Sequence, residues 1–219
     1  MSIDPLLQGY RRFRAGRFPA AQKLYRELEA RGQSPKIMFI ACCDSRVDPA
    51  TIFDTSPGEV FVLRNIANLV PPDSPVAKVQ ATSAALEFAV LYLNVEHIVV
   101  MGHARCGGAQ ALLGDIQEHM LSSGYLGSWM SIAAPARERF MRMSCPPEAR
   151  QQQIEYQIVR LGLENLLTYR WIRERVAAGK LEIHGCHFGI ANGVLALLDQ
   201  STGEFSPVPR EEPDEAGRK

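Results

Sequence analysis

Short apolar runs recur along the chain and alternate with longer stretches in which apolar residues fall three or four positions apart. The short runs predict buried strands at residues 36–41, 58–63, 97–101 and 181–183. Residues 76–93 and 146–179 lie between strands and have helical periodicity. Strands that alternate with helices in this way are typical of a parallel sheet covered by helices. We therefore expect an α/β fold with a mostly parallel central β-sheet flanked by helices.

Both ends of the chain add elements to this core pattern. Residues 1–31 have helical periodicity that Gly16 and Pro19 interrupt, which predicts an N-terminal helical arm of two segments. Residues 194–198 and 205–208 flank a turn of sequence Ser-Thr-Gly-Glu. This arrangement predicts a C-terminal hairpin at one edge of the sheet.

The length and composition are those of one ordinary globular domain. The chain has 219 residues, of which 46% are apolar, so it can bury a full-sized core. Because we find no internal repeat and no linker, we expect a single domain over residues 1–219. Its last part, residues 210–219, is charged and contains Pro and Gly, which predicts a disordered tail.

Charge and cysteine usage limit the classes of partner. Lys and Arg together number 24, as do Asp and Glu, so the net charge does not favour nucleic acid or an acidic membrane. No segment has the roughly 18 consecutive apolar residues of a membrane span, and residues 1–10 lack the apolar run of a secretory signal. The five cysteines are too sparse for a disulfide scaffold. We expect reduced thiols and a cytoplasmic location.

Candidate metal ligands follow two of the predicted strands. Cys42 comes directly after the first apolar run, and His103 comes just after the third, with Cys106 three residues later. In open α/β sheets, functional groups gather at the carboxyl ends of the strands. Two thiolates and one imidazole suit Zn²⁺ and leave one tetrahedral position open, as in catalytic zinc sites. The neighbouring Cys43 is expected to point away from the site.

Asp44 and Arg46 stand beside this ligand set in the sequence. Zinc lowers the pKa of bound water to about 7, and a nearby carboxylate can accept the hydroxide's proton in a hydrogen bond. An arginine two residues away can hold that carboxylate bidentately and keep it ionised. A salt bridge that only ties the loop is the alternative. Next to a three-ligand metal site, we favour the catalytic interpretation.

The motif Cys42-x-Asp44-Ser45-Arg46, followed by Gly102-His103-x-x-Cys106-Gly107-Gly108, resembles the β-class carbonic anhydrases. The resemblance extends from about residue 5 to about residue 200. It implies one Zn²⁺ per chain and reversible hydration of carbon dioxide to bicarbonate by attack of zinc-bound hydroxide. It also implies a homodimer or a larger homo-oligomer, with a tetramer as one form.

The resemblance assigns roles position by position. Cys42, His103 and Cys106 match the zinc ligands of the family, and Asp44 and Arg46 match its catalytic pair. Asp44 can also move onto the zinc as a fourth ligand in a closed state. The residues that match substrate-binding positions, in a pocket that lies at a dimer interface in the family, are Gln33, Phe61, Ile66, Phe88 and Gly107.

Two other functions remain open at this point. One is a non-catalytic zinc protein or redox sensor on the same fold, which the free thiols permit. The other keeps the fold and the metal but uses a related substrate such as carbon disulfide, as some relatives do. The sequence does not distinguish the two states of Asp44 or identify a proton-shuttle residue.

Overall fold

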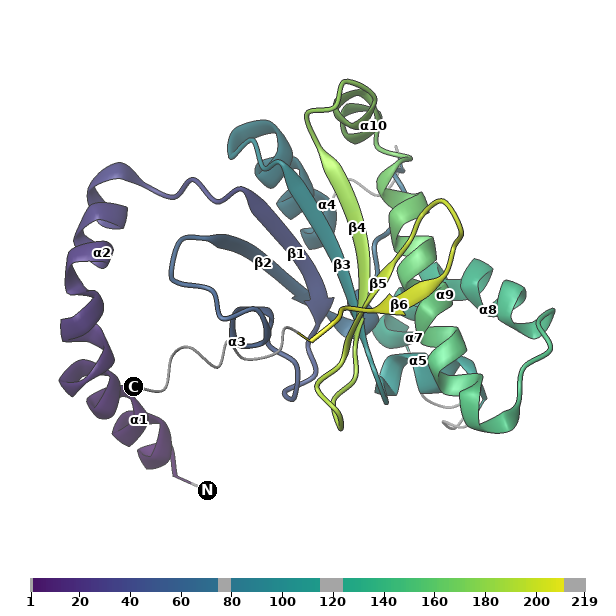
Figure 1. The fold of residues 1–219 in the computed structure, drawn as a ribbon, viewed down its shortest axis with the longest axis horizontal. Helices are drawn as coiled ribbons and strands as arrows, with labels where there is room; N and C mark the ends of the chain where they lie inside the picture. Colours follow the sequence, from purple (N-terminus) through teal and green to yellow (C-terminus); the bar gives the residue numbers. More distant parts are fainter. Residues whose placement is uncertain (1, 75–79, 115–123, 211–219) are drawn as a thin grey trace.

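A computed structural model describes residues 2–74, 80–114 and 124–210. Residues 211–219 of the expected tail at 210–219 lie outside these ranges. So do the first four residues of the expected helix at 76–93. Within the described ranges, strands form a single six-stranded sheet of order β2-β1-β3-β4-β5-β6 (Figure 1). These strands are β1 (Ile37–Cys42), β2 (Val60–Asn65), β3 (His97–His103), β4 (Glu182–Phe188), β5 (Leu195–Leu198) and β6 (Phe205–Pro207).

The sheet is mostly parallel, as the sequence predicts. Strands β2, β1, β3 and β4 pair in parallel, while β5 and β6 continue as the antiparallel hairpin at the edge. Strands β1 and β3 are neighbours although they are not consecutive in the chain. Their carboxyl ends therefore lie side by side, and this adjacency positions the candidate site.

Successive residues of β1 face opposite sides of the sheet and enter two different hydrophobic clusters. Phe39 and Ala41 pack in one, and Met38 and Ile40 pack in the other. Helix α9 (Arg150–Leu166) packs against β3 and β4. It approaches so closely that a Cβ atom at Gly185 would lie 2.8 Å from the Val159 side chain. Glycine in β4 thus permits the close contact between helix and sheet.

The expected single helix at 146–179 is wrong. The structure has two helices instead, α9 and α10 (Arg170–Ala177), because Tyr169 adopts an extended conformation between them. The buried Tyr169 hydroxyl donates to the carbonyl oxygen of Pro71 at 3.0 Å, and this contact fixes the break. Neither Gly nor Pro marks the break in the sequence, so the pattern alone does not reveal it.

The helix expected at 76–93 is irregular in the part that the structure describes. That part consists of α4 (Ala81–Glu87) and a π-helical turn at Phe88–Tyr92. Phe88 is 43% exposed and Tyr92 is 71% exposed. This face of the helix is apolar and uncovered within one chain.

The N-terminal arm forms two helices, α1 (Asp4–Ala15) and α2 (Arg17–Arg31), which meet at Gly16 as expected. No residue of either helix is buried, and Leu6 and Tyr10 are largely exposed. Figure 1 shows the arm standing apart from the helices that cover the sheet. The arm therefore presents apolar side chains that its own chain does not cover.

The remaining helices are short and surround the carboxyl edge of the sheet. They are α3 (Pro49–Ile52), α5 (Gly107–Leu112), α7 (Gly124–Met130) and α8 (Ala134–Met141), with single 3₁₀ turns at Ile66–Asn68, Ser131–Ala133 and Pro147–Ala149. Among the described residues, no helix has both the length and the apolar character needed to cross a membrane.

Candidate metal centre

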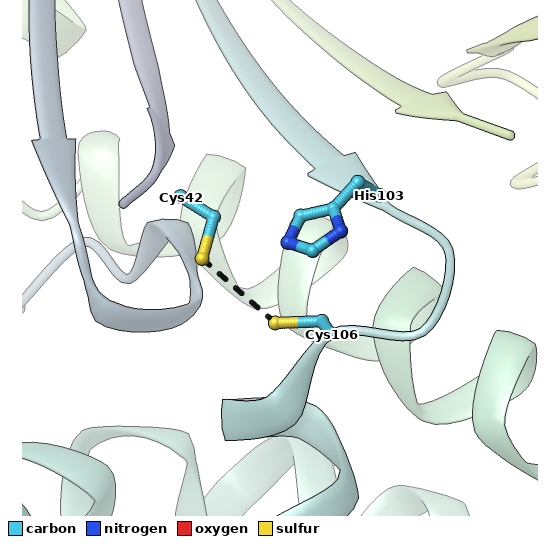
Figure 2. A group of neighbouring side chains, drawn as sticks. All are labelled: Cys42, His103 and Cys106. Carbon is cyan, nitrogen blue, oxygen red and sulfur yellow. Dashed lines mark hydrogen bonds between the residues drawn. The ribbon is translucent and has the colours of Figure 1, made fainter. Parts of the chain in front are cut away.

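The three predicted ligands converge at the carboxyl ends of two adjacent strands. Cys42 is the last residue of β1, and His103 is the last residue of β3. After His103 the chain turns sharply through Arg105, whose φ of 58° lies in the left-handed region. This turn brings Cys106 back toward the ends of both strands, where the three side chains point at one another (Figure 2).

The distances among these side chains fit a single metal ion. The sulfur atoms of Cys42 and Cys106 lie 4.0 Å apart. One ligand atom from each of the three residues lies within 4.8 Å of the other two, and all three residues are buried. Cys43 is exposed and is not part of this group, which agrees with its expected direction.

The imidazole of His103 is oriented for coordination through Nε2. Its Nδ1 atom lies 3.0 Å from the carbonyl oxygen of Ala104, and a carbonyl only accepts, so Nδ1 carries the hydrogen. Nε2 is then left with a lone pair. It is fully buried and has no hydrogen-bond partner among the described residues. A buried acceptor without a partner is costly, and a metal ion satisfies it.

The two thiols share one hydrogen bond, and it shifts their pKa values in opposite directions. Cys106 donates to Cys42 and so lowers the pKa of the Cys42 thiol, against the opposing effect of burial. The same hydrogen bond and burial raise the pKa of Cys106. Zn²⁺ favours two thiolates with an imidazole, so this donor set and the unused lone pair on Nε2 of His103 fit Zn²⁺ well.

Asp44 and Arg46 form a bidentate pair beside the ligands. Arg46 donates from Nε to Oδ1 at 2.9 Å and from Nη2 to Oδ2 at 2.7 Å. These bonds lower the pKa of Asp44 well below its usual range. The Oδ2 atom of Asp44 also lies 4.0 Å from Nε2 of His103. The carboxylate is thus ionised and adjacent to the ligand atoms, but it is held by Arg46.

Arg64 holds the loop that carries Asp44, a role that sequence reasoning missed. It donates to the carbonyl oxygens of Cys42, Asp44 and Val47 at 2.9, 2.7 and 2.7 Å. Its fourth contact is with the carboxylate of Asp48, at 3.3 Å. The turn after β1 is therefore fixed mainly through its backbone. Only the position of Arg64 near the end of a predicted strand hinted at this.

Glu155 and His187 support Cys106 from the other side and were also missed as a pair. Glu155 lies in α9 and is 3% exposed. Its Oε1 accepts from the backbone N–H of Cys106 at 3.0 Å, and its Oε2 accepts from Nε2 of His187 at 2.9 Å. A carboxylate on the apolar face of a helix, three residues before Ile158, was the available signal in the sequence.

Two predicted substrate-binding residues lie near the ligands. Gly107 is the first residue of α5, directly after Cys106. Ile66 follows β2, and a Cβ atom at Gly108 would lie 3.3 Å from its side chain. The indole N–H of Trp129 donates to the carbonyl oxygen of Ile66 at 2.9 Å, which ties this segment in place.

The other three predicted residues lie away from the ligands of their own chain. The rings of Phe61 and Phe88 are 6.0 Å apart, but Phe61 pairs in register with Met38, four residues before Cys42. Gln33 is exposed and precedes β1, whose six residues separate it from the ligand end. Because a strand of this length spans roughly 15–20 Å, Gln33 does not reach the centre of its own subunit.

The fold is a mostly parallel α/β sheet, and the Cys-His-Cys group at its strand ends could hold a metal ion with one tetrahedral position left open, as catalytic zinc sites do. A family model for carbonic anhydrase matches residues 37–195. β-Carbonic anhydrase 3 of Arabidopsis thaliana is 36% identical over 203 residues, which are 90% of this chain and 77% of that protein. The chain belongs to the β-carbonic anhydrase family, whose members are carbonate dehydratases.

Solved structures agree with this assignment. The β-carbonic anhydrase CcaA matches with a TM-score of 0.87 and 29% identity, over 95% of this chain and 92% of that chain. One structure from a study of two tetrameric β-carbonic anhydrases from the ascomycete Sordaria macrospora matches with a TM-score of 0.76 and 32% identity. That match covers 93% of this chain and 98% of the other.

Replacement of Glu155 tests its role beneath the metal ligands. We expect Glu155→Leu to lower the free energy of unfolding by about 3 kcal/mol, because two buried donors lose their acceptor. Glu155→Gln should cost less, since its oxygen can still accept from Cys106. Glu164 lies on the same helix as Glu155 and forms an exposed pair with Arg139 of α8, so Glu164→Gln should cost less than about 1 kcal/mol. Equal urea midpoints for Glu155→Leu and Glu164→Gln would contradict the assigned role.

Proposed function

We propose that this protein catalyses the reversible hydration of carbon dioxide to bicarbonate and a proton, with one Zn²⁺ per chain held by Cys42, His103 and Cys106. One observation carries this proposal. The buried Nε2 atom of His103 has no partner among the described residues and lies with two thiols beside an arginine-bound carboxylate. Membership of the β-carbonic anhydrase family supports the same substrate.

The bound ion would supply a Lewis acid that makes hydroxide available from water near neutral pH. The chain's own residues orient that water. Arg46 keeps Asp44 ionised and fixes its direction, so the carboxylate can accept a hydrogen bond from the attacking water and aim its lone pair at the substrate. We propose that Asp44 acts from this paired position. To become a fourth ligand in a closed state, it must first give up both bonds to Arg46.

The residues around the open position favour a small substrate that becomes an anion. Gly107 begins α5, and the unpaired N–H groups at a helix start favour negative charge. Ile66 adds an apolar surface nearby, which suits carbon dioxide before it reacts. A non-catalytic zinc protein needs neither the oriented carboxylate nor this arrangement, so we favour the enzyme.

We further propose that the active unit is at least a homodimer. Gln33, Phe61 and Phe88 match substrate-binding positions but lie away from the metal ligands of their own chain. The arm and the π-helical turn expose apolar side chains, including Tyr10 and Tyr92. A second copy that covers these surfaces and supplies Gln33 to the neighbouring site satisfies both observations. The tetrameric relatives from Sordaria support an assembly of two such dimers.

The location that we propose is the cytoplasm, or another reducing compartment. All five cysteines are free in the structure, and two of them belong to the candidate metal centre. Oxidation of Cys42 and Cys106 to a disulfide would remove two of the three ligands. The centre therefore requires surroundings in which thiols stay reduced.

Zinc content tests the ligand set directly. We expect wild-type protein to retain one zinc per chain after gel filtration in metal-free buffer, and Cys106→Ser to retain much less than one. Cys43→Ser is the matched control, because Cys43 is adjacent to Cys42 but exposed and outside the group. Measurement by atomic emission gives the result. Equal zinc loss in both variants would contradict the assignment.

Replacement of Asp44 separates catalysis from metal binding. We expect Asp44→Asn to lower kcat/KM for hydration at least about a hundredfold, because the neutral amide loses the charge that Arg46 holds and can turn a donor toward the water that the carboxylate orients. Zinc should remain at one per chain. Asp48→Asn is the control, since Asp48 lies in the same turn and caps α3 through an oxygen that Asn retains. Stopped-flow assays of carbon dioxide hydration measure the effect. Full activity in Asp44→Asn would contradict the proposed role of Asp44.

Complementation between subunits tests the shared site. We expect Gln33→Ala to lower activity about tenfold through a lost hydrogen bond to substrate, and Asp44→Asn to be nearly inactive. When the two variants are co-expressed, about half of the randomly paired dimers contain one chain of each. In such a mixed dimer, one of the two sites combines an intact Asp44 with an intact Gln33 from the partner. About a quarter of wild-type activity per chain should therefore be restored. Activity equal to the mean of the two homodimers would show that Gln33 does not serve the partner.

A further inference from the structure

A second group of metal-ligating side chains lies at the amino-terminal edge of the same sheet. His97 begins β3, and Glu182 and His184 stand at the start of β4. His97 and Glu182 are partners in the parallel register, and His184 follows Glu182 by two residues. Residues two apart in a strand share a face, so the strand pairing itself brings the three side chains together.

The distances in this group match one face of a coordination tetrahedron. Nδ1 of His97 lies 3.2 Å from Nε2 of His184. The Oε2 atom of Glu182 lies 3.8 Å from the first nitrogen and 3.5 Å from the second. Metal–ligand bonds of about 2.0–2.1 Å in a tetrahedron require separations of roughly 3.3–3.4 Å between ligand atoms. Shifts of a few tenths of an ångström convert the observed triangle into that geometry.

We infer that His97, Glu182 and His184 form a second binding site for a transition-metal cation of the Zn²⁺ type. Two imidazole nitrogens and one carboxylate oxygen favour Zn²⁺, Co²⁺, Ni²⁺ or Cu²⁺ over Mg²⁺ and Ca²⁺, which prefer oxygen ligands. His97 coordinates through Nδ1 and His184 through Nε2, and solvent takes the remaining position. In the absence of metal, the two rings share a hydrogen bond.

The surroundings leave the site accessible. Both histidine side chains are 39% exposed, and Glu182 is 67% exposed. A groove beside them is also lined by Lys36, Glu96, Arg175 and Lys180. Lys36 is paired with Glu96 at 2.6 Å, so one neighbouring positive charge is compensated. Burial and the adjacent His97 lower the pKa of His184, which keeps that imidazole neutral and able to bind metal near pH 7.

This site is separate from the candidate metal centre. His97 and His103 lie at opposite ends of β3, six residues or roughly 20 Å apart. The inference therefore does not depend on the proposed function. An ion at this position ties the start of β3 to the start of β4, so we expect it to stabilise the fold without taking part in the reaction at the other edge.

Metal content at controlled free zinc concentration tests the site in the zinc-loaded protein. After equilibrium dialysis at micromolar free Zn²⁺, we expect two zinc ions per chain in wild type and one in His184→Ala. The affinity for the second ion should fall more than about tenfold in the variant. Glu96→Gln is the matched control, because it removes a carboxylate from the same groove but not from the ligand group.

A second readout separates specific binding from loose surface binding. Added Zn²⁺ should raise the thermal unfolding midpoint of wild type and Glu96→Gln, but not that of His184→Ala, while Mg²⁺ at the same concentration should raise none. Circular dichroism confirms that each variant is folded. Wild type that stays at one zinc per chain overturns the inference. So does His184→Ala that binds the second ion as tightly as wild type.

Discussion

The structure depends on the adjacency of β1 and β3 in a parallel sheet. Parallel pairing requires long crossovers between strands, and it places the carboxyl ends of both strands at one edge. Cys42 and His103 end these strands and are buried there, together with Cys106. A buried nitrogen without a hydrogen-bond partner is unfavourable there, and a cation could satisfy it. The strand pairing therefore brings together the three side chains that could hold a metal ion.

The contacts around the ligands hold the backbone more than the side chains. Arg64 donates hydrogen bonds to three carbonyl oxygens of the 42–47 segment, and Glu155 accepts one from the N–H of Cys106. This division has a physical reason, because the proposed ion would itself orient the ligand side chains. The protein would then need only to prevent the two loops from moving apart. Arg46 then has a different task, which is to orient Asp44 without drawing it away from the centre.

The sequence was sufficient for the parts of the structure that depend on local pattern. The apolar runs predicted the first four strands and the edge hairpin, and the positions of Cys42, His103 and Cys106 predicted that these side chains lie together. It failed where a distant contact decided the outcome. Tyr169 breaks the long helix because its hydroxyl bonds to Pro71, and Glu155 reaches Cys106 across 49 residues. No local preference encodes either contact. Gln33 shows a further limit, since its match to a substrate-binding position did not predict that it lies away from the metal ligands of its own chain.

The five histidines illustrate why residue type alone does not assign a role, and four of them are described in the structure. His103 is fully buried, its tautomer is fixed by Ala104, and its second nitrogen is left unpaired. His187 is almost as buried, but Glu155 accepts its hydrogen, so it supports a loop and has no lone pair aimed at the ligands. His97 and His184 are half exposed and face each other, so water can compete for both nitrogens. The free-energy cost of leaving a nitrogen without a hydrogen bond is large for the buried His103 and small for the half-exposed His97 and His184. The buried, unpaired nitrogen of His103 therefore favours a metal ion more strongly than the two half-exposed imidazoles at the amino-terminal edge do, although imidazole ligands are present in both groups.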